Sequence, residues 1–193
     1  MKIYLFDLDW VIVNSEMFTY WIEEEFWINK IFLDDFFINH FADCLIWKKD
    51  LKETIKYYLD NSEWKKWVDE LLNFWFNFEN KPNLELLSAI KKLRENGKIC
   101  CIISNQEKYR ADFIKNTMKL WNNFDEMFFS CDLGVKKPDL DFFDIIYKKL
   151  EANYWNINKK DIYFYDDDIK NIENWNKFWF NSQLFSKNLI NNL

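Results

Sequence analysis

Residues 3–9, IYLFDLD, place two aspartates directly after a short apolar run. The apolar residues follow one another without strict alternation with polar ones, which is typical of a strand buried on both faces of a parallel sheet. Ligands of such sheets bind beyond the carboxyl ends of the strands. The stretch therefore predicts the first strand of a parallel sheet, with Asp7 and Asp9 at its functional edge.

Four later apolar runs also end in polar residues. They are ICCIISN (99–105), MFFSCD (127–132), IYFYDDD (162–168) and the weaker SQLF (182–185). Helical patterns separate these runs over residues 83–97, 106–119, 139–151 and 168–178. In the first of them Asn83 is a suitable N-cap, and Gly97 follows the last turn. Strands alternating with helices predict an α/β fold with a Rossmann-like parallel sheet flanked by helices.

Residues 15–80 differ from the rest of the chain. They show helical spacing and many aromatic residues, without a convincing strand, and they fall between the first two strands. We expect a helical cap here, inserted into an α/β core formed by residues 1–14 and 81–193. The aromatic residues expected to form the core of this cap, rather than to contact substrate, include Phe18, Tyr20, Trp21, Phe26 and Phe32.

The composition argues against several classes of protein. The 193 residues carry a net charge of −6, and the acidic residues are dispersed, whereas a nucleic-acid binder normally has a basic stripe. No stretch resembles a membrane-spanning helix or a signal peptide, so we expect no membrane partner and a cytoplasmic location. The four cysteines form no CxxC pair and are expected to be reduced, and a single histidine excludes a His-rich zinc site.

Polar residues at the predicted strand ends form one set. They are Asp7 and Asp9, Ser104 and Asn105, Lys137 in the loop after the third strand, and Asp166 with Asp167. Carboxylates from two strands can bind a hard cation such as Mg²⁺, and a hydroxyl with a lysine can bind a phosphoryl group beside it. One carboxylate next to a cation can act as a nucleophile, and a second one can act as acid and base.

The order of these motifs resembles that of the haloacid dehalogenase-like hydrolase superfamily. The resemblance spans residues 2–185 and includes the position of the cap. Its four motifs are matched by Asp7-Leu8-Asp9-Trp10-Val11-Ile12, by Ser104 in IISNQ, by Lys137 in LGVKKPD, and by Asp166 and Asp167 in YFYDDDIKNIE. A single DxD motif would be weak evidence, but four motifs in order at predicted strand ends are specific.

The resemblance implies a role for each matched residue. Asp7 would attack phosphorus and form an aspartyl-phosphate, and Asp9 would protonate the leaving alcohol and then activate water. The implied Mg²⁺ site comprises the Asp7 side chain, the Asp9 backbone carbonyl and Asp166, with Asp167 supporting the metal or orienting Lys137. The phosphoryl oxygens would be bound by Ser104, Asn105 and Lys137. Dehalogenases of the family lack the second aspartate, so Asp9 favours a phosphatase acting on a small phosphorylated metabolite.

Three alternatives remain open at the level of sequence. A phosphosugar mutase would use the same scaffold and pass the phosphoryl group to a second substrate hydroxyl. A signalling receiver domain also gathers Asp, Ser or Thr, and Lys at strand ends, but it is shorter and has no cap. A non-catalytic binding protein is the third alternative if Trp10 is genuine and blocks the site.

The tryptophans are unusual in number and position. There are 11 tryptophans and only 2 glycines, together about 7% of the chain, which is the usual share of glycine alone. Trp10 stands where the family commonly has glycine. Trp27, Trp121 and Trp179 stand at predicted helix ends that favour glycine, and Trp175 stands where the family has a small residue. Either these tryptophans are genuine and strain the loops, or UGA codons for glycine have been translated as tryptophan. The second hypothesis predicts glycine at positions 10, 27, 121 and 179.

Overall fold

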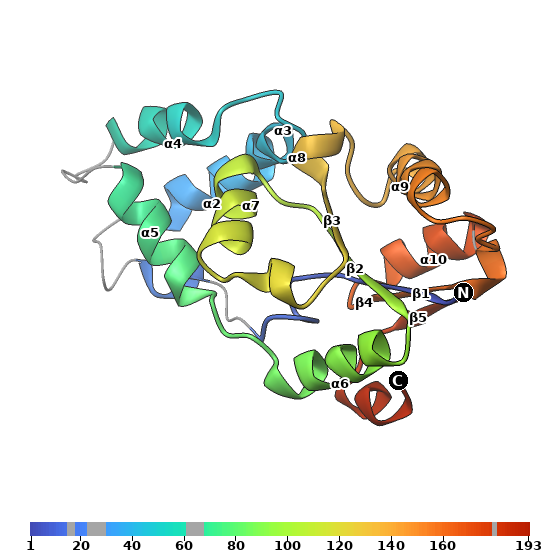
Figure 1. The fold of residues 1–193 in the computed structure, drawn as a ribbon. Coiled ribbons are helices and arrows are strands. Elements are labelled where there is room, and N and C mark those ends of the chain that lie inside the picture. Colours follow the sequence, from blue (N-terminus) through green and yellow to red (C-terminus); the bar gives the residue numbers. More distant parts are fainter. Residues whose placement is uncertain (15–17, 23–29, 61–67, 179–180) are drawn as a thin grey trace.

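A computed structural model describes residues 1–14, 18–22, 30–60, 68–178 and 181–193 (Figure 1). The predictions for Phe26, Trp27 and Trp179 lie outside these residues, and so do those for the side chains of Tyr20 and Phe32. Five parallel strands form one sheet in the order β3-β2-β1-β4-β5. The strands are β1 (Ile3–Phe6), β2 (Ile99–Ser104), β3 (Glu126–Phe129), β4 (Ile162–Asp166) and β5 (Ser182–Leu184).

The register of the sheet brings the predicted strand ends to one edge. Phe6 on the central strand β1 lies opposite Ile102 of β2 and Tyr165 of β4. The chain therefore leaves all three strands at nearly the same level, with the predicted polar residues next in sequence. The strands are shorter than the apolar runs suggested. In particular, the run 127–132 is divided between β3 and the short helix α8 (Ser130–Leu133).

Helices cover both faces of the sheet, as the apolar strands predicted (Figure 1). Tyr4 and Phe6 pack on one face in a cluster with helix α6 (Leu84–Glu95), helix α7 (Lys108–Asn116) and the C-terminal turn η4 (Lys187–Asn192). Ile3 and Leu5 pack on the other face with helix α9 (Leu140–Asn153) and helix α10 (Ile169–Phe178). A short turn, η3 (Lys159–Asp161), precedes β4.

The helix ends confirm some predictions and correct one. The Asn83 side chain accepts a hydrogen bond from the Leu86 N–H and caps α6, and Gly97 beyond the helix has φ +71°. Helix α7 ends at Asn116, earlier than predicted, and the left-handed residue after it is Lys119, with φ +54°. Trp121 lies in the turn η2 (Leu120–Asn122) and does not have a positive φ, so its predicted glycine-favouring position is wrong.

The segment between β1 and β2 forms helices with a hydrophobic cluster of their own. The described elements are η1 (Phe18–Tyr20), α2 (Lys30–Asn39), α3 (Phe41–Leu45), α4 (Leu51–Asp60) and α5 (Val68–Phe78). The rings of Phe18 and Trp75 stack in this cluster with centroids 4.5 Å apart. The chain leaves the core and returns to it at adjacent points. The Asn14 N–H donates to the Lys81 carbonyl at 2.8 Å, and Val13 forms an isolated β-bridge with Pro82.

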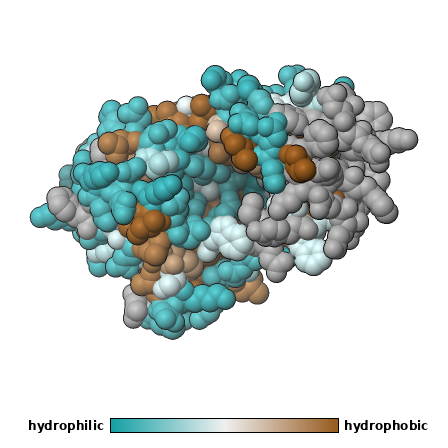
Figure 2. Space-filling model, turned by 180° about the vertical axis from the view of Figure 1, so that it is seen from behind, coloured by the Kyte–Doolittle hydropathy of each residue, from teal (hydrophilic) through white to brown (hydrophobic). Residues whose placement is uncertain are grey.

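The surface is mainly polar on the face shown in Figure 2, where hydrophobic side chains form separate patches. Within the described residues, no helix has both the length and the apolar character needed to cross a membrane. The cysteines are all free; Cys44, Cys100 and Cys101 are buried, and Cys131 is partly buried.

Candidate active site

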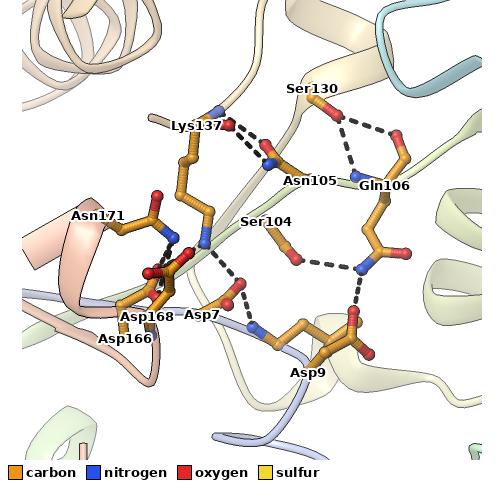
Figure 3. A network of polar contacts seen from close by, with 11 residues as sticks. Asp7, Asp9, Ser104, Asn105, Gln106, Ser130, Lys137, Asp166, Asp168 and Asn171 are labelled. Atoms are coloured by element: carbon orange, nitrogen blue, oxygen red, sulfur yellow. Dashed lines mark hydrogen bonds and ion pairs between the residues drawn. The ribbon is translucent and has the colours of Figure 1, made fainter. Parts of the chain in front are cut away.

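Three predicted residues meet at the carboxyl edge of the sheet, between the ends of β1 and β4 (Figure 3). The Lys137 Nζ lies 2.8 Å from Asp7 Oδ1 and 2.6 Å from Asp166 Oδ2. All three residues are buried. Burial raises the pKa of Asp7 to about 7, although Lys137 opposes this shift. Burial lowers the pKa of Lys137, but the two carboxylates outweigh it and leave that pKa raised.

Asp166 is held rigidly at the end of β4. Its Oδ1 accepts hydrogen bonds from the Asp168 N–H at 2.8 Å and from the Asn171 amide at 3.0 Å. Asp168 in turn caps α10 by accepting from the Lys170 N–H at 2.8 Å. Asn171 is a site residue to which the sequence alone assigns no role beyond local bridging. The beginning of α10 therefore fixes the orientation of a carboxylate that is fully excluded from solvent.

The side chains at this edge fit a divalent hard cation. Asp7, Asp166 and Asp167 each offer a carboxylate oxygen, and these oxygens lie within 4.8 Å of one another. With Lys137 beside them, three carboxylates and one ammonium leave a net charge of −2 that a divalent cation would neutralise. An all-oxygen donor set is the one that Mg²⁺ prefers. The Asp9 carboxylate does not belong to this cluster.

Ser104 and Asn105 follow β2, and their side chains already have partners. Ser104 is buried, and its Oγ accepts a hydrogen bond from the Gln106 amide at 3.1 Å. The Asn105 amide donates to the Lys137 carbonyl at 2.9 Å, and its Oδ1 accepts from the Lys137 N–H at 2.8 Å. Asn105 therefore ties the Lys137 loop to the end of β2, which positions the lysine.

Two residues to which the sequence motifs assigned no role hold the Asp9 side chain, and a third residue contacts one of them. The Gln106 amide donates to Asp9 Oδ2 at 2.6 Å, and Arg110 Nη2 donates to Asp9 Oδ1 at 2.8 Å. The other arm of the guanidinium, Nη1, lies 2.5 Å from Glu79 Oε2. Gln106 precedes helix α7 and its N-cap Glu107, whereas Arg110 lies in the first turn of the helix. Neither position in the sequence carried information about the partner of these two side chains.

A cavity of about 210 Å³ lies beside Asp9. Its polar residues are Asp9, Glu79, Asn105, Gln106 and Arg110, and its aromatic residues are Trp10, Phe18, Phe37, Phe41 and Trp75. Phe18 belongs to the cap cluster, as expected, and so does Trp75, but both also line this cavity. Burial raises the pKa of Glu79 to about 7, with Arg110 opposing the shift.

The backbone distinguishes the tryptophans from one another. Trp10 has φ +62° and Trp47 has φ +57°, which lie in the left-handed region where glycine is strongly preferred. Trp175, by contrast, is fully buried in α10 and packs on Phe143 and Phe164, with ring centroids 4.6 and 4.8 Å away. The conformational argument for glycine therefore applies to Trp10, extends to Trp47, and does not apply to Trp121 or Trp175.

The sequence of residues 4–177 matches the family model of the haloacid dehalogenase-like hydrolases. The chain belongs to this family. The match covers nearly all of strands β1 to β4, the helical insertion and all four predicted motifs, and it ends before β5. Among proteins with curated descriptions, none is significantly similar in sequence.

Solved structures of other haloacid dehalogenase-like proteins share the fold. A predicted HAD-like family hydrolase from Porphyromonas gingivalis has a TM-score of 0.80 and 18% identity, over 100% of this chain and 95% of that chain. A HAD family enzyme from Bacteroides thetaiotaomicron, in complex with magnesium and inorganic phosphate, has a TM-score of 0.80 and 17% identity, over 96% and 94% of the two chains. A dehalogenase with an intermediate complex has a TM-score of 0.66 and 15% identity, over 94% and 83%. At these identities the likeness shows the fold alone.

Proposed function

We propose that this haloacid dehalogenase-like hydrolase is a Mg²⁺-dependent phosphatase that hydrolyses a small phosphorylated metabolite through an aspartyl-phosphate. The observation that carries the proposal is the placement of Asp9. Its carboxylate is partly exposed and lines the cavity, whereas Asp7, two residues earlier, is buried with Lys137 and Asp166. A phosphate ester releases an alkoxide that needs a proton, whereas carbon–halogen cleavage releases a halide that does not. A second, cavity-lining carboxylate therefore favours phosphoryl transfer over dehalogenation.

In the proposed first step, an oxygen of Asp7 attacks phosphorus as the bond from phosphorus to the leaving oxygen breaks. Asp9, which enters this step protonated, gives its proton to that oxygen and becomes the carboxylate that pairs with Arg110, and the alcohol departs from the cavity. In the second step, Asp9 takes a proton from a water molecule as its oxygen attacks phosphorus. The bond from phosphorus to Asp7 breaks, inorganic phosphate leaves, and both aspartates return to their starting state.

The other site residues would bind and orient the phosphoryl group. The Ser104 hydroxyl and the Lys137 ammonium would donate to its oxygens, and Asn105 would keep Lys137 in place through the two hydrogen bonds to its backbone. Asp7, Asp166, Asp167 and the Asp9 carbonyl would hold Mg²⁺, which when bound offsets negative charge at the phosphoryl group. The magnesium and phosphate bound to the Bacteroides enzyme are consistent with this proposal.

We also propose that residues 15–80 act as a cap over the site. The cavity beside Asp9 lies between the sheet edge and the aromatic cluster of this segment, so a bound leaving group would contact both. Such a cap excludes water from the reaction and selects the substrate.

A panel of phosphorylated metabolites tests the proposal. The purified chain is expected to release inorganic phosphate from at least one of them in the presence of Mg²⁺, to stop on addition of EDTA, and to resume on addition of excess Mg²⁺. Haloacids tested in parallel are expected to yield no halide. A phosphorylated product with little free phosphate would indicate a mutase instead. Halide release without phosphate release would contradict the proposal.

A further inference from the structure

Arg110 is an unusual residue for the interior of this protein. It lies in the first turn of α7, and only 4% of its surface is exposed. Glu107 caps this helix and accepts a hydrogen bond from the Arg110 N–H at 2.6 Å, which fixes the backbone from which the guanidinium projects. A buried arginine is retained only when its charge is balanced, because transfer of an unpaired charge from water is costly.

The guanidinium of Arg110 bridges two carboxylates from different parts of the chain. One arm donates to Asp9 Oδ1 at 2.8 Å, and the other lies 2.5 Å from Glu79 Oε2. Within the described part of the chain Nη1 has no well-aligned hydrogen bond, so the contact with Glu79 is an ion pair. Arginine suits this bridge because its planar fork can bind two acceptors at once, which a lysine ammonium does with less directionality.

Glu79 connects this bridge to the cap. It directly follows α5, the last cap helix, and it precedes the crossing where Lys81 and Pro82 contact the chain after β1. The ion pairs thus run from the exit of the cap through α7 to the DxD loop. Any movement of the cap that displaces Glu79 changes the balance of charge around Arg110.

Both oxygens of the Asp9 carboxylate are held in this arrangement. Arg110 binds Oδ1, and the Gln106 amide binds Oδ2 at 2.6 Å. A general acid must present its proton to the leaving oxygen within hydrogen-bond reach, and an orientation error of about 1 Å costs roughly two orders of magnitude in rate. The residues that hold Asp9 therefore bear directly on its proposed function.

We infer that Arg110 is a positioning residue for Asp9. Glu79 in turn holds Arg110, so one chain of ion pairs links the end of the cap to the Asp9 carboxylate and orients that carboxylate. This inference rests on the proposed phosphatase function. It assigns to Arg110 an effect on proton transfer to the leaving group, and not on attack by Asp7.

Leaving-group dependence separates such a role from a merely structural one. Release of p-nitrophenolate from p-nitrophenyl phosphate needs little protonation, whereas release of an alkoxide from glycerol phosphate needs a general acid. Arg110→Gln is expected to lower kcat for glycerol phosphate at least about tenfold more than kcat for p-nitrophenyl phosphate, because general acid catalysis contributes about 10²- to 10⁴-fold. KM is expected to change much less, and Arg110→Lys is expected to restore part of the loss.

A double mutant shows whether Arg110 acts through Asp9. Asp9→Asn alone is expected to give the same selectivity, and Arg110→Gln in that background is expected to cause no further loss, because residues that act as a unit are not additive. The matched control is Arg94→Gln, which removes an arginine paired with Asp125 outside the active site and is expected to leave kcat and KM unchanged. Glu79→Gln is expected to show the selectivity of Arg110→Gln at a smaller amplitude, and it tests the inference even if Arg110→Gln does not fold.

Two results would overturn the inference while the proposed function stands. One is an equal loss on both substrates in the Arg110 and Glu79 variants of an otherwise active enzyme. The other is a double mutant whose loss is the product of the two single losses. A wild-type chain that releases no phosphate from any substrate would instead overturn the proposed function, and the inference with it.

Discussion

Asp7 and Asp9 are two residues apart, but different regions of the molecule hold them. Asp7 lies at the sheet edge, where it pairs with Lys137 from a loop of the core, and Lys137 also pairs with Asp166 at the end of β4. Asp9 lies on the side of the cap, where Gln106, Arg110 and, through Arg110, Glu79 determine its surroundings. The nucleophile proposed here is therefore fixed by the core alone, whereas the proposed acid–base group depends on where the cap exit lies.

The difference follows from the geometry of the fold. Asp7 and Asp166 lie at the ends of neighbouring parallel strands, so the sheet itself brings them together. Lys137 comes from the loop after α8, which Asn105 ties to the end of β2. The residues around Asp9 come from a helix turn and from the end of α5, which the sheet does not place. Mutations at the sheet edge should accordingly abolish chemistry, and mutations on the cap side should modulate it.

The largest expected effect is that of Asp7→Asn. Asparagine keeps the shape of the side chain but removes the nucleophile, so phosphate release should fall by at least about 10³-fold. The unfolding temperature should stay near that of the wild type. Asp132→Asn, at an exposed aspartate paired with Lys115, is the control and should retain full activity. Near-normal turnover by Asp7→Asn would show that another group attacks phosphorus.

The second effect concerns the metal and contrasts the two regions directly. Asp166→Asn should weaken Mg²⁺ binding at least about tenfold by calorimetry, because loss of a ligand is more severe than loss of an outer-shell partner. Asp9→Asn should leave Mg²⁺ affinity nearly unchanged, since its side chain is directed at Gln106 and Arg110. Equal Mg²⁺ affinities in wild type and Asp166→Asn would remove Asp166 from the proposed ligand set.

The third effect is on the pH dependence of stability. The pKa of Glu79 is raised from 4.5 to about 7 in the folded chain, so between these values the folded state binds more protons than the unfolded state. The stabilisation is complete below pH 4.5 and is lost as the pH rises to about 7. Glu79→Gln should reduce this loss by on the order of 1 to 3 kcal/mol in urea titrations with EDTA present.

Glu79→Gln should not abolish the pH dependence, because the pKa values of Asp7 and Glu107 are also raised to about 7 by burial. Those two groups lose stabilisation in the same direction as the pH rises. If the free energy of unfolding changed equally between pH 4.5 and 7 in Glu79→Gln and in wild type, the raised pKa of Glu79 would be contradicted.

The smallest expected effect is that of Trp10→Gly, at the loop that joins the two regions. A non-glycine residue in the left-handed region costs roughly 1–2 kcal/mol, so the variant should gain about that much stability. Its kcat/KM should also rise, because the indole lines the cavity beside Asp9. Trp47→Gly should gain stability similarly, whereas Trp121→Gly, without a positive φ, should not.

The hypothesis that UGA codons for glycine have been translated as tryptophan also has a direct test. Peptide mass spectrometry of the protein from its source cells, compared with the codons, should show glycine at position 10 and, by the same conformational argument, at position 47. UGG codons and tryptophan-containing peptides at these positions would contradict the hypothesis. The packing of Trp175 between Phe143 and Phe164 provides no such argument from backbone strain.

The sequence by itself determined the fold class and the edge of the sheet at which the candidate site lies. Continuous apolar runs indicate strands buried on both faces, and the residue after each run must emerge at the carboxyl edge of a parallel sheet. Asp7, Ser104, Lys137 and Asp166 were therefore predictable as neighbours before any distance was known. The capping positions of Asn83 and Asp168 were predictable for the same reason, because the interactions that place them are local.

Only the tertiary structure decided which groups hold Asp9 and how Asn105 is used. Gln106 and Arg110 are separated from Asp9 by about a hundred residues, and no periodicity or cap links such pairs. Likewise, nothing in the motif IISNQ indicates that the Asn105 amide binds the backbone of Lys137. Backbone periodicity and hydrophobic burial are written into short stretches of sequence, whereas the pairing of buried charges depends on where distant loops and helices finally meet.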